Sequence, residues 1–302
     1  MLQMNNAARA AQEALEIRKL FPPAWESMGQ LRRAVDAWMA DWLAERSRQA
    51  RDQGLAARAE DALDRRIRTD LPEHTDNPAV SDARKLRIVR SLHRTNIALG
   101  VYRNYADVLL PVLKKTAERL GREVKVLELA SGSGGMAMHL ARTCARRNLP
   151  VSVTGSDYVP QVVDGANERA LQKGNPARFR LVNAFAMDAL SDGEYDVIYI
   201  TGTMHHFSPG SLAVIMAQSR RVATSHFIGL DGLRSLGLLL FLPAVHVLTL
   251  LPDHVHDAWL TARKFYSLFE LGLIARMALP GVPVSARHSF PDVSVLTADF
   301  RA

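Results

Sequence analysis

A glycine-rich turn directly after a short apolar run is the segment of this sequence best suited to bind a small molecule. The run Val124–Leu129 carries an acid, Glu128, near its end, and the turn over residues 131–135 is Ser-Gly-Ser-Gly-Gly. Glycines let the backbone turn sharply and approach a ligand closely, because no Cβ stands in the way. A helix is predicted from about residue 136, and the N–H groups at its start favour an anionic group. The spacing therefore predicts a bound cofactor at this turn.

A second acid, Asp157, ends the next predicted strand, 23 residues after Gly134. In an open parallel sheet this position lies beside the same crevice, where a carboxylate accepts hydrogen bonds from ribose hydroxyls. Residues 132–137 also fit the dinucleotide pattern G-x-G-x-x-G/A. The acid Glu128 suits a cationic amino-acid cofactor better than a pyrophosphate, so an NAD-dependent enzyme is the less favoured alternative.

These residues resemble the first two motifs of a known enzyme family. The segment Glu128–Gly135 is similar to the E/D-x-G-x-G-x-G signature of class I S-adenosylmethionine-dependent methyltransferases, with Ala130 in place of the first glycine. Gly155–Tyr158 resembles the second motif, and three later segments follow the family's order: 182–186, 194–199 and 203–207. The last is similar to a turn frequent in small-molecule and quinone-biosynthesis methyltransferases. Through these five motifs the chain is identified as a member of the family.

The resemblance implies S-adenosylmethionine as the cofactor and a role for each matching residue. The turn residues would line its amino-acid end, and Glu128 would orient that end or the turn. Asp157 would bind the ribose and Tyr158 would pack on the adenine. Thr201 would form the base of the pocket near the sulfonium. The family often has an acid after the third strand that contacts the adenine amine, and this chain has none there. The contact would then come from the backbone or from Asn183. The implied cofactor-binding residues are Glu128, Ala130, Ser131, Gly132, Gly134, Asp157, Tyr158, Asn183, Ala184, Phe185 and Thr201.

Two adjacent histidines, His205 and His206, follow the fourth predicted strand and are the candidate catalytic residues. A histidine there could remove a proton from a phenol, an acid or an activated carbon as the methyl group arrives. The alternative is that one caps the turn while the other lines the site. Methyl transfer often needs little more than in-line positioning of the reacting atoms.

A metal site is not predicted, although the chain has ten histidines. His254, His256 and Asp257 could converge on a cation, but no third imidazole lies at a useful spacing. The same segment resembles an element on the substrate side of the pocket in related methyltransferases, where Arg263 could serve similarly. Asp231 and Arg234 resemble a D-x-x-R-S element of those relatives.

The elements that must position these residues are short apolar runs alternating with helical stretches from residue 123 onward. This alternation predicts an α/β fold, a parallel sheet with helices on both faces. With the resemblance it becomes a Rossmann-like, doubly wound, mostly parallel seven-stranded sheet. The predicted strands are 124–129, 151–156, 178–182, 196–201 and 226–230, with late extended pieces at 273–279 and 293–296.

The first 95 residues lack this alternation and predict helices, since Leu31, Val35, Trp38 and Trp42 recur at helical spacing. We expect residues 1–95 to form an N-terminal helical extension that caps the site or makes a homodimer, and 96–302 to form the methyltransferase domain. Within it, residues 231–257 contain a long apolar run. This segment is predicted to be an apolar substrate lid, with a buried core helix as the alternative.

Composition excludes several classes of function. The net charge of +7 is dispersed along the chain, and no proline pair follows the fourth strand to hold a flipped base. The single cysteine, Cys144, lies in the helix after the glycine turn, so carbon-5 pyrimidine methylation lacks its nucleophile. A nucleic-acid partner is therefore unlikely by sequence. The apolar run is shorter than the roughly 20 residues of a membrane span, and with no secretory signal a cytoplasmic location is expected.

The predicted function is transfer of a methyl group from S-adenosylmethionine to oxygen or carbon of a small apolar or aromatic acceptor. Two alternatives stay open. One is an RNA or protein methyltransferase that uses the basic surface, and the other is a catalytically silent methyltransferase-like binding protein.

Overall fold

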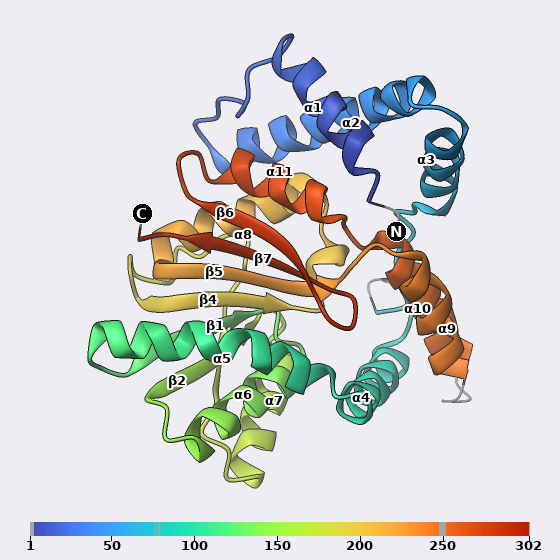
Figure 1. Ribbon diagram of the computed structural model, residues 1–302. Helices are drawn as coiled ribbons and strands as arrows, with labels where there is room; N and C mark the ends of the chain where they lie inside the picture. The colour runs from blue at the N-terminus through green and yellow to red at the C-terminus, as the bar shows by residue number, and fades with distance from the viewer. Residues whose placement is uncertain (1–2, 76, 78, 248–251, 302) are drawn as a thin grey trace. The chain divides into compact units, whose positions relative to one another are not determined.

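The computed structural model describes residues 3–75, 77, 79–247 and 252–301 (Figure 1). The chain divides into two compact units, each built from separate segments. The first unit comprises Met1–Asn77, Met204–Ala217 and Asp231–Leu296, and the second comprises Pro78–Thr203, Gln218–Leu230 and Thr297–Ala302. The division follows a different line from the predicted boundary at residue 95, because two later segments join the N-terminal helices in the first unit.

The second unit contains the glycine turn and most of the parallel strands. Val124 to Leu129 forms the strand predicted there, and its neighbours pair in parallel register, for example Glu128 with Gly155 on one side and with Tyr199 on the other. The elements are α4 (Asp82–Ala98), α5 (Val101–Leu120), β1 (Val124–Leu129), α6 (Gly135–Arg146), β2 (Val151–Asp157), α7 (Pro160–Gln172), β3 (Arg178–Leu181), β4 (Tyr195–Thr201) and β5 (Ala223–Gly232).

The seven strands have the order β3-β2-β1-β4-β5-β7-β6, with β6 at Val284–Ser289 and β7 at Val293–Asp299. Only three residues join β6 to β7, so this pair is antiparallel. Strands β1 and β4 lie in the middle and are almost wholly buried, as expected for a parallel sheet with helices on both sides. The predicted Rossmann-like, mostly parallel fold is confirmed.

The first unit is mainly helical. In Figure 1, α1 lies along α2, and α9 and α10 lie side by side. Its elements, besides β6 and β7, are α1 (Asn5–Glu16), α2 (Met28–Asp52), α3 (Leu55–Ile67), the short 3-10 turn η1 (Met204–His206), the start of α8 (Pro209–Val222), α9 (Leu236–Val247), α10 (Pro252–Lys264) and α11 (Leu268–Ala278).

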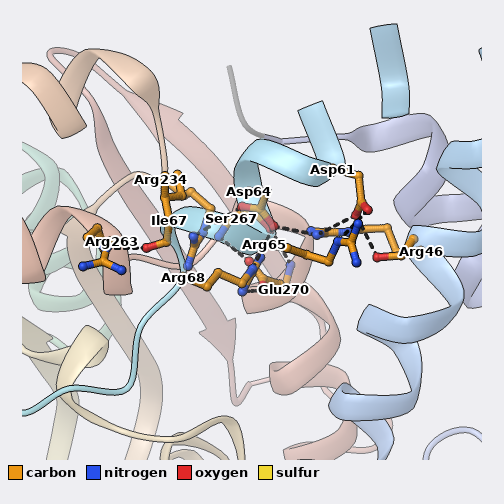
Figure 2. A network of polar contacts seen from close by, with 11 residues as sticks. Arg46, Asp61, Asp64, Arg65, Ile67, Arg68, Arg234, Arg263, Ser267 and Glu270 are labelled. Atoms are coloured by element: carbon orange, nitrogen blue, oxygen red, sulfur yellow. Dashed lines mark hydrogen bonds and ion pairs between the residues drawn. The ribbon is translucent and has the colours of Figure 1, made fainter. Parts of the chain in front are cut away.

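A buried network of ions holds the N-terminal helices to the rest of the first unit (Figure 2). The carboxylate of Asp64, on α3, lies 2.5 Å from Arg46 of α2, 2.8 Å from Arg68 and 3.3 Å from Arg234. Arg68 also lies 2.8 Å from Glu270 of α11. Burial alone would raise the pKa of Asp64, but the three guanidinium groups lower it. Each buried charge is compensated by neighbours of opposite sign, which such groups require.

The prediction and the structure differ at two elements. The extended piece at 273–279 is wrong, since these residues lie in α11 up to Ala278. A short apolar run fits helix and buried strand equally, and here a capping box decides: Ser267 Oγ accepts from the Glu270 N–H while Glu270 Oε2 accepts from the Ser267 N–H. Strand β6 (Val284–Ser289) is not among the predicted strands, and Gly100, where φ is +67°, separates α4 from α5.

The predicted lid, residues 231–257, contains α9 and the start of α10, and its residues 248–251 lie outside the described residues. Helix α9 is apolar on more than one face: Leu239 packs with Ile67 and Ala262, while Leu240 is 70% and Phe241 51% exposed. Among the residues that the structure describes, no helix combines the length and apolarity needed to cross a membrane.

Candidate functional site

The turn after β1 takes three left-handed backbone conformations in quick succession. The φ angles are +50° at Ala130, +51° at Gly132 and +74° at Gly134. Two of these positions are glycines, which adopt such angles at no steric cost. Ala130, at the position of the family's first glycine, adopts the same conformation at a cost of about 1 kcal/mol. The turn therefore takes a left-handed conformation at Ala130 although this residue has a Cβ.

The aromatic ring of Phe179, on β3, packs against the backbone of this turn. A Cβ placed on Gly134 or on Gly155 would overlap the ring. Sequence analysis identified Gly134 and Gly155 within motifs but missed Phe179. The ring allows no side chain at either glycine, so the turn and the second strand pack through it.

Asp157 ties the end of β2 to the glycine turn. Its Oδ2 accepts a hydrogen bond from the Gly132 N–H at 3.1 Å, and its Oδ1 accepts from the Val159 N–H at 3.1 Å. Burial raises the pKa of Asp157, partly offset by these backbone donors. A carboxylate has about four acceptor sites, so hydroxyl donors can be added to the two backbone bonds. The adjacent Tyr158 side chain is 74% exposed.

Glu128 and Thr201 meet beneath the turn, from the neighbouring strands β1 and β4. The Thr201 hydroxyl donates to Glu128 Oε1 at 2.7 Å. The other oxygen, Oε2, is buried and has no hydrogen-bond partner within the described part of the chain. Burial raises the pKa of Glu128 to about 8, against the lowering effects of the Thr201 and Tyr199 hydroxyls and of the Ala137 N–H. A cationic group near Oε2 would satisfy this atom and favour the carboxylate.

The predicted adenine segment forms a tight turn after β3. The Asn183 side-chain oxygen accepts from the Phe185 N–H at 2.9 Å, and the Asn183 carbonyl accepts from the Ala186 N–H at 3.0 Å. The Val182 N–H donates to the Asp157 carbonyl, which holds the turn to β2. Asn183 thus shapes this turn through its side chain, and Ala184 and Phe185 lie at its tip.

Two residues that sequence analysis missed, His93 and Tyr102, stand over the start of α6. His93 Nδ1 lies 2.9 Å from the Tyr102 hydroxyl, and a Cβ on Gly135 would be 2.5 Å from both atoms. Burial, assisted by the charge of Glu128, raises the pKa of Tyr102 to about 12. His93 and Tyr102 lie far from the turn in sequence, so no motif or spacing could link them to it.

The two candidate catalytic histidines lie in the first unit, on η1. Asp231 fixes His205 twice, since its Oδ2 accepts from the His205 backbone N–H at 3.0 Å and lies 2.9 Å from Nδ1. On the other side of the ring, Nε2 lies 3.7 Å from Glu73 Oε1. His206 Nε2 lies 3.9 Å from Glu73 Oε2. Burial by itself lowers the pKa of His205, but Asp231 and Glu73 raise it overall.

A second cluster joins Asp257 to His256 and His74. His74 Nδ1 lies 2.6 Å from Asp257 Oδ1, and His256 Nδ1 lies 3.3 Å from the same oxygen. His74 is the further imidazole that the spacing of the sequence lacked, and it comes from the segment between α3 and α4. The His254 side chain lies outside the described residues.

The matches to known proteins cover this same region. Residues 126–226, which contain the glycine turn, Asp157 and His205, match the family model described as "Methyltransferase domain". This segment matches a methyltransferase domain. The predicted family resemblance is thereby confirmed for about a third of the chain.

The methyltransferase domain has the fold of solved methyltransferases. The plantazolicin methyltransferase BamL, solved with S-adenosylhomocysteine and a triazolic desmethylPZN analog, superimposes with a TM-score of 0.54 at 15% sequence identity. The match covers 72% of this chain and 91% of that one. The plantazolicin methyltransferase BpumL, solved with S-adenosylhomocysteine, gives a TM-score of 0.53 at 14% identity, with the same coverage.

Curated relatives of this chain include uncharacterized proteins of Mycobacterium tuberculosis and Mycobacterium bovis. Each is 32% identical over 139 residues, which is 44% of this chain and 46% of the relative. The match thus spans less than half the length of these relatives.

Proposed function

We propose that this protein transfers a methyl group from S-adenosylmethionine to oxygen or carbon of a small apolar or aromatic molecule. The observation that carries the proposal is the pair Glu128 and Thr201 under the glycine turn. Glu128 Oε2 is buried and makes no hydrogen bond of ordinary geometry with the described residues, while the Tyr199 hydroxyl and the Ala137 N–H face the same carboxylate. A cationic amino-acid cofactor offers the ammonium group that such an oxygen requires.

The residues of the second unit would hold the cofactor as the family resemblance implies. Asp157 would accept hydrogen bonds from the ribose hydroxyls with its remaining lone pairs, and the exposed ring of Tyr158 would pack on the adenine. Glu128 would bind the ammonium group, while Ser131, Gly132 and Gly134 would approach the amino-acid end through backbone. When bound, the cofactor supplies an activated methyl group on a sulfonium. The chain's task is then to place the acceptor in line with it.

The first unit would serve the acceptor. It contains His205 and His206, the apolar helix α9 and the N-terminal helices. The exposed Leu240 and Phe241 support the proposal that α9 belongs to an apolar lid over the acceptor. In His205 the Nδ1 atom is engaged by Asp231, so Nε2 is the atom that would act on the acceptor.

The N-terminal helices are proposed to cap the acceptor site. Their placement in one compact unit with α9, α10 and η1 supports a cap more than a separate extension. A homodimer formed through these helices, and a cytoplasmic location, complete the proposal.

Among the alternatives, a silent binding protein and an NAD-dependent enzyme can be separated directly by calorimetry. We expect S-adenosylhomocysteine to bind the full chain and NAD not to bind. Incubation with methyl-labelled S-adenosylmethionine and a metabolite extract should then give a labelled product that partitions into organic solvent. Binding of NAD alone would overturn the proposed cofactor. Label appearing only in RNA or protein would overturn the proposed acceptor class.

A further inference from the structure

Glu73 faces the imidazoles of His205 and His206 across two gaps that no hydrogen bond spans. Its oxygens lie 3.7 Å from His205 Nε2 and 3.9 Å from His206 Nε2, beyond hydrogen-bond length. One ligand atom from each residue lies within 4.8 Å of the other two. Two ligands bound tetrahedrally to one zinc ion at about 2.1 Å are roughly 3.4 Å apart. The spacing is therefore close to that of ligands around a common cation.

The Glu73 carboxylate is also left without a sufficient partner. The residue is 5% exposed, and Oε1 has no hydrogen bond among the residues described. The ammonium of Lys264 lies 3.7 Å from the same oxygen, so it compensates the charge without a hydrogen bond. A buried carboxylate oxygen is normally satisfied by donors or by a metal ion.

Asp231 binds the second ring nitrogen of His205, as carboxylates commonly do for metal-binding histidines. A histidine ligand usually donates its second ring N–H to a carboxylate, which fixes the tautomer and aims the other nitrogen at the metal. Asp231 lies 2.9 Å from His205 Nδ1 and also binds the His205 backbone N–H. The Phe265 ring packs edge-on against the His205 ring, 5.1 Å between centroids. The Nε2 atom is thereby held toward Glu73.

We propose that Glu73, His205 and His206 bind a divalent transition-metal cation. Two imidazoles and one carboxylate are ligands that suit zinc, manganese or iron, whereas magnesium and calcium prefer oxygen alone. Three protein ligands leave coordination positions open, so an acceptor oxygen could bind there as a further ligand. The cation site deepens the proposed function, because Nε2 of His205 then acts on the acceptor through the metal. Cation binding is measured without methyl transfer, so the cation site and the proposed methyl transfer can each be disproved independently of the other.

The positive charge of Lys264 would repel a cation bound at Glu73, so Lys264 offers a separate test of the site. An ammonium 3.7 Å from Glu73 Oε1 competes with a metal for the same oxygen. Its replacement by the neutral Lys264→Met should tighten cation binding, whereas loss of a ligand should weaken it. A structural ion cluster with no metal role would not produce these opposite effects.

The cluster of His74, His256 and Asp257 supplies a matched control. Its histidine nitrogens lie 2.6 and 3.3 Å from one carboxylate oxygen, so it is held by direct hydrogen bonds rather than spaced around a gap. His256 is half exposed and offers an imidazole to metal as well as any surface histidine does. We therefore expect His256→Ala to leave the tight site intact.

The experiment is a titration of the chelator-treated full chain with Zn²⁺ in competition with a chromophoric chelator, repeated with Co²⁺ by absorption. We expect one tight equivalent in the wild type and in His256→Ala. Glu73→Gln and His206→Ala should lower the affinity at least about tenfold, and Asp231→Asn about 10- to 100-fold. Lys264→Met should raise it. Circular dichroism and thermal unfolding confirm which variants fold.

Two results would overturn the proposal. The first is a wild-type protein without a one-equivalent site for either metal. The second is a cation affinity that stays the same in the folded variants Glu73→Gln and Lys264→Met, or a tight site that is lost in His256→Ala. Glu73→Gln preserves side-chain volume, so its loss of metal with unchanged thermal unfolding of the metal-free protein cannot come from misfolding.

Discussion

The ring of Phe179 packs on the Cα of Gly155, from a neighbouring strand of the sheet, and leaves no room there for a side chain. Gly134 of the cofactor turn meets the same ring. The turn therefore depends on a glycine that lies outside it, 21 residues later in the chain. A change at Gly155 should act on the turn through Phe179.

Gly155→Ala should lower the free energy of unfolding by about 1–3 kcal/mol, because the new methyl group forces the Phe179 ring to move. The loss should be smaller in a Phe179→Leu background, where the obstructing ring is gone. Gly272→Ala is the control: it lies in α11 with open space around it and should be neutral or stabilising by up to about 1 kcal/mol. Urea unfolding measures all four variants. Equal losses in both backgrounds would show that Phe179 is not the cause.

Ala130→Gly should stabilise the protein by no more than about 1 kcal/mol. Glycine removes the cost of the left-handed conformation at φ +50°, but it also gains more freedom in the unfolded chain. Ala130→Val should destabilise, because a β-branched side chain is a stronger outlier at this angle. Chemical denaturation gives both values, and calorimetry with S-adenosylhomocysteine should show retained affinity for Ala130→Gly only. A stabilised Ala130→Val would contradict the strained turn.

Glu128 should make the stability of the ligand-free protein depend on pH. Burial raises its pKa from 4.5 to about 8 in the folded chain, so the folded state holds this proton more tightly than the unfolded state. The stabilising effect of the proton is complete below pH 4.5 and is lost as the pH rises through about 8. Relative to Glu128→Gln, the wild type should lose about 1.4 kcal/mol of unfolding free energy per pH unit in this window.

Denaturant unfolding of wild type and Glu128→Gln across pH 4.5 to 8 tests this dependence. Thr201→Val should extend the window upward, because it removes the hydroxyl donor that favours the carboxylate. A difference between wild type and Glu128→Gln that stays constant with pH would exclude a raised pKa for Glu128.

Asp64→Asn should cost about 3–5 kcal/mol of stability, because it removes the charge that three buried arginines share. Arg65→Ala removes a largely exposed guanidinium that lies 3.0 Å from the buried Asp61. Because Asp61 keeps its contacts with Arg46 and Ser47, stability should change by no more than about 1 kcal/mol. Thermal and urea unfolding compare the two variants. Similar small losses for both would mean that the network in Figure 2 contributes little to the attachment of α2 and α3.

The local course of the chain around the cofactor turn could be predicted from sequence. Val124–Leu129 forms the predicted strand, the helix predicted from about residue 136 begins at Gly135, and the Gly132 N–H of the glycine turn donates to Asp157. Such features depend on backbone conformation and on alternation over a few residues, which neighbouring residues determine. The secondary structure of residues 273–279 was harder to predict, because a short apolar run has no periodicity that separates a helix from a strand.

Only the tertiary structure decided which distant residues complete each group. Glu73 stands between α3 and α4, 132 residues before His205, yet its carboxylate faces both histidines. Phe179, His93 and Tyr102 likewise contact glycines far away in sequence. Spacing along the chain carries no information about such contacts, because they arise from packing of whole elements. The sequence alone therefore determined the class of fold and the shape of the glycine turn, and packing determined which side chains surround His205 and His206.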